Sequence, residues 1–293
     1  MKEKWIKRVL GLSAKLPLRL NHGLGAFLGK RLARGNATEK RTAQTNIELC
    51  FPELSAERKQ QLVEQSLIET GKTIIESGVI WFSSQQRFFK LVKEVHGEKY
   101  LKAGLDNGKG VILSIPHLGN WEAIGMYCSS HYPMTSLYRP PRLSGMDDVI
   151  RTARQRFGAK LVPTNAKGVK ALYQALGNNE LVAILPDQDP RENSGQFAPF
   201  FGYQANTMTL LSRLAQKTGA TVLATYAERL PNGQGFAIHF CPTPQEIHDK
   251  DMATSVRALN ESVEEVVRRI PQQYQWGYKR FRTRPEDEPE IYD

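Results

Sequence analysis

The sequence has little cysteine, and its three cysteines lie far apart at positions 50, 128 and 241. An odd number of scattered cysteines indicates neither a disulfide framework nor a zinc cluster built from closely spaced thiols. We therefore expect a protein that works in a reducing compartment or faces one.

The sequence also lacks a continuous apolar run of the ~20 residues that an α-helix needs to cross a bilayer. Lys15, Arg19 and Lys30 interrupt the apolar stretches near the N-terminus, which for the same reason make a poor secretory signal. Internal repeats, low-complexity tracts and a Gly-x-Ser-x-Gly nucleophile elbow are absent as well. What is left is a chain of 293 residues, 40% of them hydrophobic, that is able to bury a sizeable core.

Positive charge is concentrated at the N-terminus. The formal charge of the chain is +10, and residues 1–41 hold eleven cations and only two acidic residues, so the remainder is nearly neutral. These cations alternate with leucine and other apolar residues, as in helices that lie on anionic lipid surfaces. We predict a basic amphipathic arm over residues 1–42 that binds the membrane and bends near Pro17. A helix docked on the protein itself and a nucleic-acid-binding arm are alternatives, but the high leucine content disfavours nucleic acid.

The periodicity of apolar residues predicts the remaining elements. Ser55 is a good cap for a helix that continues to about residue 80. Beyond residue 110, short apolar runs predict strands, and the amphipathic stretches between and after them predict helices. The strands are expected at 111–115, 134–138, 161–162, 181–185, 221–227 and 236–240, and the helices at 120–130, 145–157, 167–177, 207–218 and 252–270.

This alternation predicts the fold class. We expect an α/β domain over residues 43–285, with a central, mostly parallel mixed sheet flanked by helices and with antiparallel pairing of the late strands. An acidic, solvated tail is expected over residues 286–293.

His117 stands at the carboxyl end of the predicted strand 111–115, the place where open α/β sheets bind their ligands. Asn120 is placed to cap the next helix, and Glu122 falls in its first turn. We predict that Glu122 accepts a hydrogen bond from one ring nitrogen of His117 and leaves the other nitrogen as a base. The spacing also fits a histidine that caps the helix while Glu122 interacts with the helix dipole.

Residues 117–122 read His-Leu-Gly-Asn-Trp-Glu, and this run resembles the lysophospholipid acyltransferase superfamily. Its closer likeness is to the bacterial lipid A late acyltransferases, the lauroyl and myristoyl transferases. Glutamate at position 122 supports the closer likeness, because the wider superfamily usually has aspartate there. The resemblance covers most of the chain and includes the basic N-terminus and the segments at 46–54, 138–140, 185–189, 200–202 and 276–281.

The resemblance implies a reaction and a location. A fatty acyl chain would pass from an acyl carrier protein thioester to a hydroxyl of a lipid A precursor, as in the secondary acylation of lipopolysaccharide biosynthesis. His117 would take the hydroxyl proton, and the oxygen would attack the thioester directly. We expect no cofactor and no metal, and a position at the cytoplasmic face of the inner membrane.

Three other functions stay open at this point. An acyl thioesterase would use His117 to activate water instead of a lipid hydroxyl. The second is an acyltransferase whose acceptor is another glycolipid or a lysophospholipid. A non-enzymatic lipid-binding protein would need only the arm and an apolar slot.

Arg139 follows the predicted strand 134–138, and the family pattern has an arginine at this position. A guanidinium there would stabilise a developing oxyanion or bind an anionic donor, whereas the plainer alternative is a surface salt bridge. Asp187 and Asp189 follow the strand 181–185, and we predict that they orient substrate or pair with Arg139. A metal site on the two aspartates is disfavoured because no further ligands accompany them.

Two further groups are candidates for substrate contact. Lys279 and Arg280 are placed to face the anionic phosphates of the acceptor, unless they belong to an amphipathic structural end. Phe200, Phe201 and Met208 are candidates for the wall of an acyl slot, although aromatic residues at this spacing also suit an ordinary core.

Overall fold

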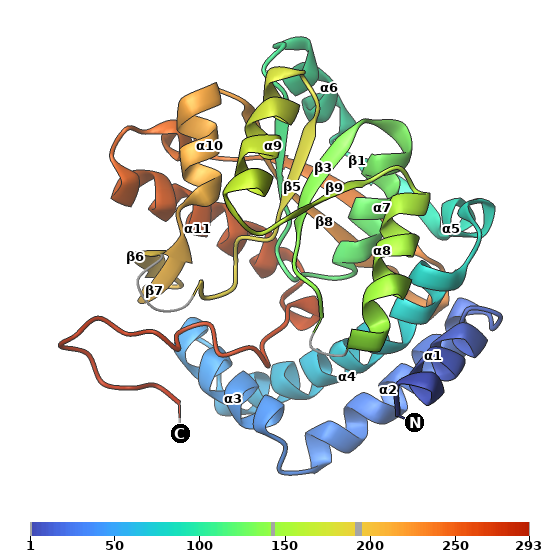
Figure 1. The fold of residues 1–293 in the computed structure, drawn as a ribbon. Coiled ribbons are helices and arrows are strands. Elements are labelled where there is room, and N and C mark those ends of the chain that lie inside the picture. The colour runs from blue at the N-terminus through green and yellow to red at the C-terminus, as the bar shows by residue number, and fades with distance from the viewer. Residues whose placement is uncertain (1, 142–143, 191–194, 293) are drawn as a thin grey trace.

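A computed structural model of the chain describes residues 2–141, 144–190 and 195–292. At its centre lies a seven-stranded sheet in the order β1-β9-β8-β2-β5-β3-β4 (Figure 1). The strands are β1 (Val92–His96), β2 (Val111–Ser114), β3 (Met134–Tyr138), β4 (Lys160–Pro163), β5 (Leu181–Ile184), β8 (Thr221–Arg229) and β9 (Phe236–Pro242). A separate hairpin consists of β6 (Gly195–Phe200) and β7 (Tyr203–Met208).

Every neighbouring pair in the large sheet is parallel except β8 and β9, which are antiparallel. This confirms the predicted mixed, mostly parallel sheet and its antiparallel late pair. All four residues of β2 and all four of β5 are buried, as expected for central parallel strands covered on both faces.

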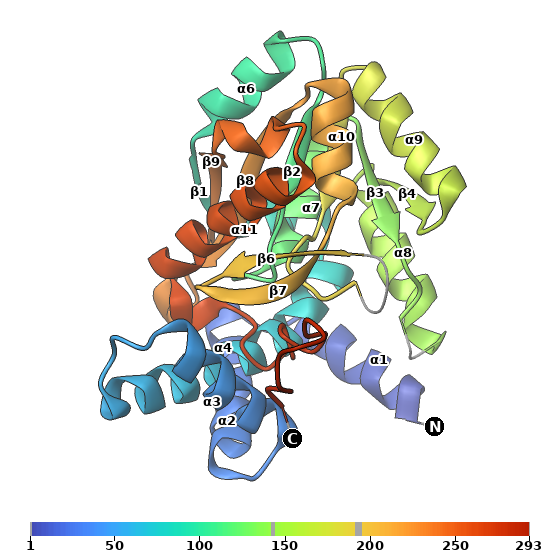
Figure 2. The same ribbon diagram turned by 90° about the vertical axis from the view of Figure 1, so that its left-hand side faces the viewer.

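Two cores lie on opposite faces of this sheet. Val111 and Leu113 of β2 pack into one core with α5, α6, α7 and α8, whereas Ile112 packs into the other with α9, α10 and α11. Figure 1 shows α10 and α11 on one side of the sheet and α7 and α8 on the other, and in Figure 2 α10 and α11 lie in front of the strands. The helices are α5 (Gln85–Leu91), α6 (Glu98–Asp106), α7 (Trp121–His131), α8 (Asp147–Arg156), α9 (Ala166–Gly177), α10 (Leu210–Thr218) and α11 (Met252–Arg269).

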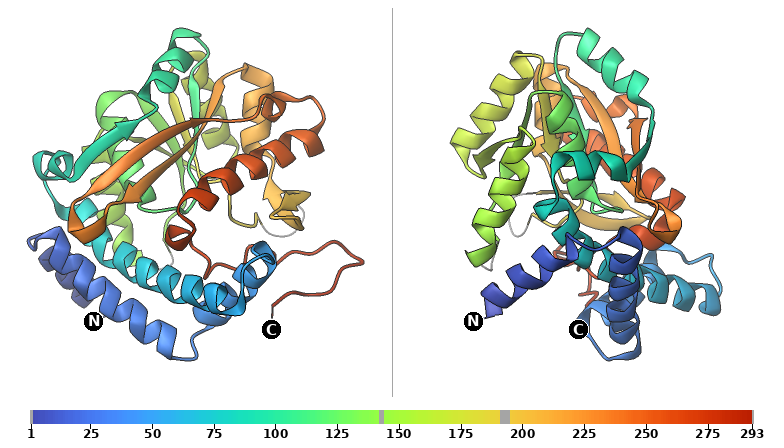
Figure 3. Two further views of the ribbon diagram at one scale, coloured as in Figure 1. Left: turned by 180° about the vertical axis from the view of Figure 1, so that it is seen from behind. Right: turned by 90° about the vertical axis from the view of Figure 1, so that its right-hand side faces the viewer.

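Four N-terminal helices form a further layer across one end of the strands of the sheet (Figures 1 and 3). They are α1 (Lys2–Ser13), α2 (Leu18–Arg34), α3 (Thr38–Cys50) and α4 (Ala56–Phe82). Pro17 stands directly before α2, at the predicted bend, and Ser55 caps α4 by accepting a hydrogen bond from the backbone N–H of Arg58. The domain boundary predicted after residue 42 falls inside α3.

Helix α2 crosses α4 at very close range because glycines meet at the crossing. A Cβ atom built on Gly71 of α4 would lie 2.2 Å from the carbonyl oxygen of Gly25 of α2. The arm is therefore held against the body of the protein by direct backbone contact. Within the described part of the chain, we find no helix with the length and apolar character required to cross a bilayer.

The outward side of the two N-terminal helices is apolar at several positions and basic at others. Lys15, Arg19 and Lys30 are exposed there. Exposed large apolar side chains of the same two helices are Leu12, Leu20, Leu24, Phe27 and Leu28. The basic amphipathic arm and its contact with a membrane stay predictions.

The C-terminal segment is only partly the solvated tail that the sequence predicts. Glu286, Asp287 and Glu290 are exposed. The end of the segment returns to the protein, however, because the Tyr292 hydroxyl donates a hydrogen bond to the side-chain oxygen of Asn46 on α3.

Candidate active site

The turn that carries His117 begins where β2 leaves the sheet. Ile115 still donates its N–H to the carbonyl of Ile184, over 2.8 Å, but Pro116 has no N–H and ends the ladder. His117 therefore leaves the sheet at its carboxyl end, as the sequence predicts.

Two neighbouring segments hold this turn by its backbone. Gly119 donates its N–H to Gln273, and Asn120 donates its N–H to Ala227 at the end of β8, over 3.0 and 2.9 Å. Gly119 has a φ of +62°, and a Cβ atom there would lie 2.0 Å from the Ala227 carbonyl oxygen. Only glycine fits at this position, so the turn has little freedom to move.

Asp187 is the carboxylate that binds the His117 ring. Its Oδ1 lies 2.8 Å from Nδ1 of His117, and its Oδ2 accepts the backbone N–H of His117 over 2.8 Å. The pair forms because β5, which ends just before Asp187, lies beside β2 in parallel register. Burial alone would raise the pKa of Asp187, but the adjacent imidazole and its hydrogen bonds hold that pKa below the ordinary value.

This hydrogen bond assigns the two ring nitrogens. Since Asp187 is an anionic acceptor, Nδ1 carries the proton and Nε2 carries the free lone pair. The side-chain amide nitrogen of Gln188 lies 3.2 Å from Nε2 and donates to it. The His117 side chain keeps 14% of its surface exposed and faces a pocket lined by Thr70, Thr73, Ile74, Trp121, Gln273 and Gln275.

Glu122 does not bind the ring, so this part of the sequence prediction is wrong. Its carboxylate binds the guanidinium of Arg154 on α8 through two contacts, 3.1 Å from Nε and 2.5 Å from Nη2. Burial favours the neutral acid, but Arg154 outweighs it and lowers the pKa of Glu122. Helix α7 thus directs Glu122 toward α8, while Asp187 reaches the ring from the neighbouring strand.

Asn120 serves the turn in two ways. Its Oδ1 caps α7 by accepting the backbone N–H of Ala123 over 3.2 Å, as predicted. Its Nδ2 donates to the buried carboxylate of Glu76 on α4 over 2.9 Å. The sequence did not single out Glu76.

Asp189 and Arg280 are buried and bind other parts of the protein. Asp189 accepts the backbone N–H of Thr283 over 2.8 Å. Arg280 is only 3% exposed and donates to the carbonyl of Asn206 and the hydroxyl of Thr207, both over 2.6 Å. The prediction that Arg280 faces the acceptor is therefore wrong, because its guanidinium is withdrawn from solvent.

A family model described as bacterial lipid A biosynthesis acyltransferase matches residues 5–283 of the chain. The chain belongs to this family. The lipid A biosynthesis lauroyltransferase of Escherichia coli (strain K12) is 29% identical over 285 residues, covering 97% of this chain and 92% of the relative. The palmitoleoyltransferase of the same organism is 29% identical over 288 residues, with coverages of 97% and 92%. The myristoyltransferase is 25% identical over 280 residues, with coverages of 95% and 86%.

In this lipid A acyltransferase family member, an apolar groove lies next to the His117 pocket. Trp121 borders both, and its ring centroid is 4.9 Å from that of the His117 ring. The groove is lined by Ile115, Trp121, Glu122, Gly125, Met134, Ser136, Leu137, Arg154, Ala159, Ala183 and Leu185. The aromatic residues predicted for an acyl slot lie elsewhere, since Phe200 and Phe201 are buried in the core with Phe51 and Trp276.

The two other cations predicted to contact substrate lie on or near the surface. Arg139 is exposed directly after β3. Lys279 lies over the ring of Tyr292, 5.3 Å from its centroid. Neither contact assigns a function, so their predicted roles toward donor and acceptor remain predictions.

Proposed function

We propose that this family member is an O-acyltransferase that moves a fatty acyl chain from acyl carrier protein to a hydroxyl of a lipid A precursor. The observation that carries the proposal is the His117–Asp187 pair beside a pocket, because a carboxylate at Nδ1 favours the tautomer in which Nε2 is the base. Family membership supports the choice of acceptor and of reaction. No cofactor is needed for this chemistry.

The proposed step conserves atoms and charge. The acceptor hydroxyl gives its proton to Nε2 of His117 while its oxygen attacks the thioester carbonyl, so an ester bond forms and the carbon–sulfur bond breaks. Asp187 stabilises the imidazolium ion that exists during this step. The proton then passes to the leaving thiolate. A base of this kind is worth ~10²–10⁴ in rate.

The other predicted residues take supporting roles in the proposal. Glu122 joins the first turn of α7 to Arg154. Because Trp121 lies in the same turn, this contact also helps to fix its position. Arg139 stabilises the oxyanion or binds the anionic donor, and Lys279 contacts acceptor phosphate. Asp189 supports the segment after β5 from inside the protein.

The product decides between transfer and hydrolysis. Purified protein with a mixed pool of acyl carrier protein thioesters and a lipid A precursor should yield the acylated lipid as the main product in mass spectrometry. A thioesterase would release mainly free fatty acid even when acceptor is saturating. That outcome would overturn the proposal, and the chain length of the lipid product would report donor preference.

We further propose that the apolar and basic surface of α1 and α2 binds the cytoplasmic face of the inner membrane. Ile74 of α4 is 52% exposed and also lines the His117 pocket, so a membrane at this surface would lie near the site. Each buried apolar side chain is worth ~1.5–3 kcal/mol, and each cation ~1 kcal/mol at an anionic surface.

The double variant Leu24→Ser/Phe27→Ser should therefore bind vesicles with phosphatidylglycerol at least ~10-fold more weakly than the unmodified protein. Vesicle sedimentation at two salt concentrations measures this. Tyr100→Ser is the matched control, because Tyr100 is similarly exposed but lies on α6. Equal binding of the double variant and the unmodified protein would rule out this surface.

A further inference from the structure

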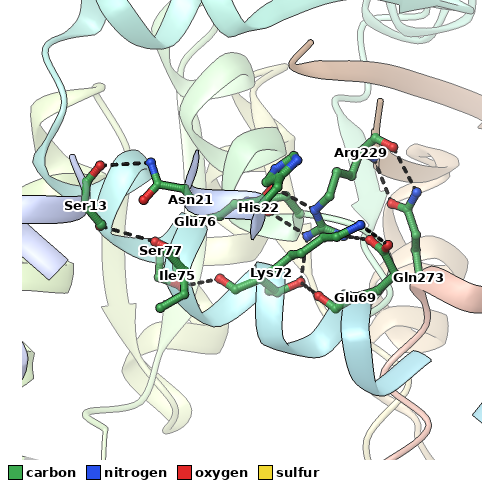
Figure 4. A network of polar contacts seen from close by, with 12 residues as sticks. Ser13, Asn21, His22, Glu69, Lys72, Ile75, Glu76, Ser77, Arg229 and Gln273 are labelled. Atoms are coloured by element: carbon green, nitrogen blue, oxygen red, sulfur yellow. Dashed lines mark hydrogen bonds and ion pairs between the residues drawn. The ribbon is translucent and has the colours of Figure 1, made fainter. Parts of the chain in front are cut away.

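Glu76 is a carboxylate with no surface exposed, placed between three parts of the fold (Figure 4). Arg229 at the end of β8 binds both of its oxygens, from Nε to Oε1 and from Nη2 to Oε2, each over 2.6 Å. His22 of α2 contacts Oε1 through its Nε2. Asn120 completes the set by donating its Nδ2 to Oε2.

The network keeps this carboxylate charged. Burial alone would raise the pKa of Glu76, but Arg229 and His22 lower it to about 2. Arg229 is in turn neutralised by Glu69 and also donates to the Thr73 hydroxyl, each over 2.7 Å. A buried charge is costly unless its partners are fixed, so the carboxylate oxygens have a well-defined direction.

The two backbone hydrogen bonds that hold the His117 turn are both connected to this network. Asn120, which donates to Glu76, also binds Ala227, two residues before Arg229. Gln273, which holds Gly119, binds the backbone of Arg229 twice, accepting its N–H over 2.8 Å and donating to its carbonyl over 3.0 Å.

An apolar residue at position 76 would fill the space without the cost of burying a charge. Such a residue could not accept the hydrogen bonds that the Asn120 amide and Arg229 donate, and a carboxylate does. We infer that Glu76 is a positioning residue for His117: it holds Asn120, and thereby the turn that presents the imidazole to Asp187. The inference rests on the proposed role of His117 as the base.

Asn120→Asp tests this link without removing the helix cap. Aspartate caps a helix as well as asparagine does, but its carboxylate faces Glu76 and cannot donate a hydrogen bond. We expect kcat for acyl transfer to fall about 10- to 100-fold while KM is nearly unchanged. The reason is that a catalytic group displaced by up to about 1 Å loses rate by this much.

The double variant Glu76→Gln/Asn120→Asp exchanges donor and acceptor between these two side chains, because the glutamine amide donates to the new carboxylate. The same amide nitrogen cannot accept the hydrogen bond that Nη2 of Arg229 donates to Oε2, so we expect part of the lost kcat to return. Asn165→Asp is the matched control, since Asn165 caps α9 in the same way but lies outside the site, and it should keep full activity. An unchanged kcat in Asn120→Asp overturns the inference, and a double variant that is more active than the single one supports it.

A readout independent of activity separates this inference from the proposed function. In protein labelled with ¹⁵N-histidine, the Nδ1–H proton of His117 should move or broaden in Asn120→Asp and return in the double variant. If the unmodified protein transfers no acyl group, the proposed function fails. If the resonance stays unchanged in Asn120→Asp, the positioning role fails.

Discussion

Replacing His117 with alanine is expected to lower kcat for acyl transfer by about 10³-fold or more, because it removes the base of the proposed step. Initial rates with an acyl carrier protein thioester and a lipid A precursor measure the loss. Alanine also removes the ring partner of the buried Asp187 carboxylate and is expected to lower Tm, so thermal stability is measured together with turnover.

His117→Gln keeps the two effects apart. The glutamine amide still donates a hydrogen bond toward Asp187 but has no lone pair able to accept a proton. We expect the same loss of kcat with a smaller change in Tm. His131→Ala is the control, because His131 is an exposed histidine at the end of the same helix, α7, and it should keep full turnover. Turnover within about tenfold of normal in both His117 variants would contradict the role of His117 as the base.

The elements that the sequence predicts correctly are those whose burial leaves a continuous apolar run or a periodic pattern. Strands β2 and β5 are buried along their whole length and read as continuous apolar runs. The sequence does not predict strand β1, because this strand lies at the edge of the sheet and its charged residues Lys93 and Glu94 are exposed. The hairpin of β6 and β7 lies apart from the sheet and mixes polar with apolar residues, so alternation was equally hard to see there.

In the candidate site, the features that depend on nearby residues are predicted correctly, and those that depend on contacts distant in the sequence are not. The placement of His117 and the cap by Asn120 depend on neighbours within a few residues, and the sequence predicts both. The partner of the ring depends on which strand lies beside β2, which spacing along the chain does not reveal. Spacing therefore predicts Glu122, the carboxylate nearer in the sequence, although Asp187 is the one that binds His117.

The sequence contains one indication of the buried network around Glu76. Glu76 interrupts the apolar face of the predicted helix beside Ile75 and Val79, and a charge on such a face needs a partner. Arg229, at the end of a strand more than 150 residues away, is that partner. Neither residue alone identifies the other, because the contact depends on how α4 packs across the end of β8.

The two carboxylates can be told apart by replacing each with its amide. In Asp187→Asn the amide nitrogen no longer accepts the Nδ1 proton, so the ring favours the tautomer with its proton on Nε2 and loses the base that faces the pocket. We expect kcat to fall by about 10³-fold, with the downfield Nδ1–H resonance of His117 lost from the NMR spectrum.

Glu122→Gln acts on a different group. It leaves the His117–Asp187 pair intact but removes the charge that neutralises Arg154, whose two hydrogen bonds fix the start of α7. We expect turnover to fall together with Tm, because a half-buried guanidinium loses its partner, while the Nδ1–H resonance persists. Both variants are thus expected to be impaired, and the ring proton separates the reasons. If Glu122→Gln abolished that resonance and Asp187→Asn retained it, the ring would be bound by Glu122 in solution, and the base would be oriented from its own helix rather than from the neighbouring strand.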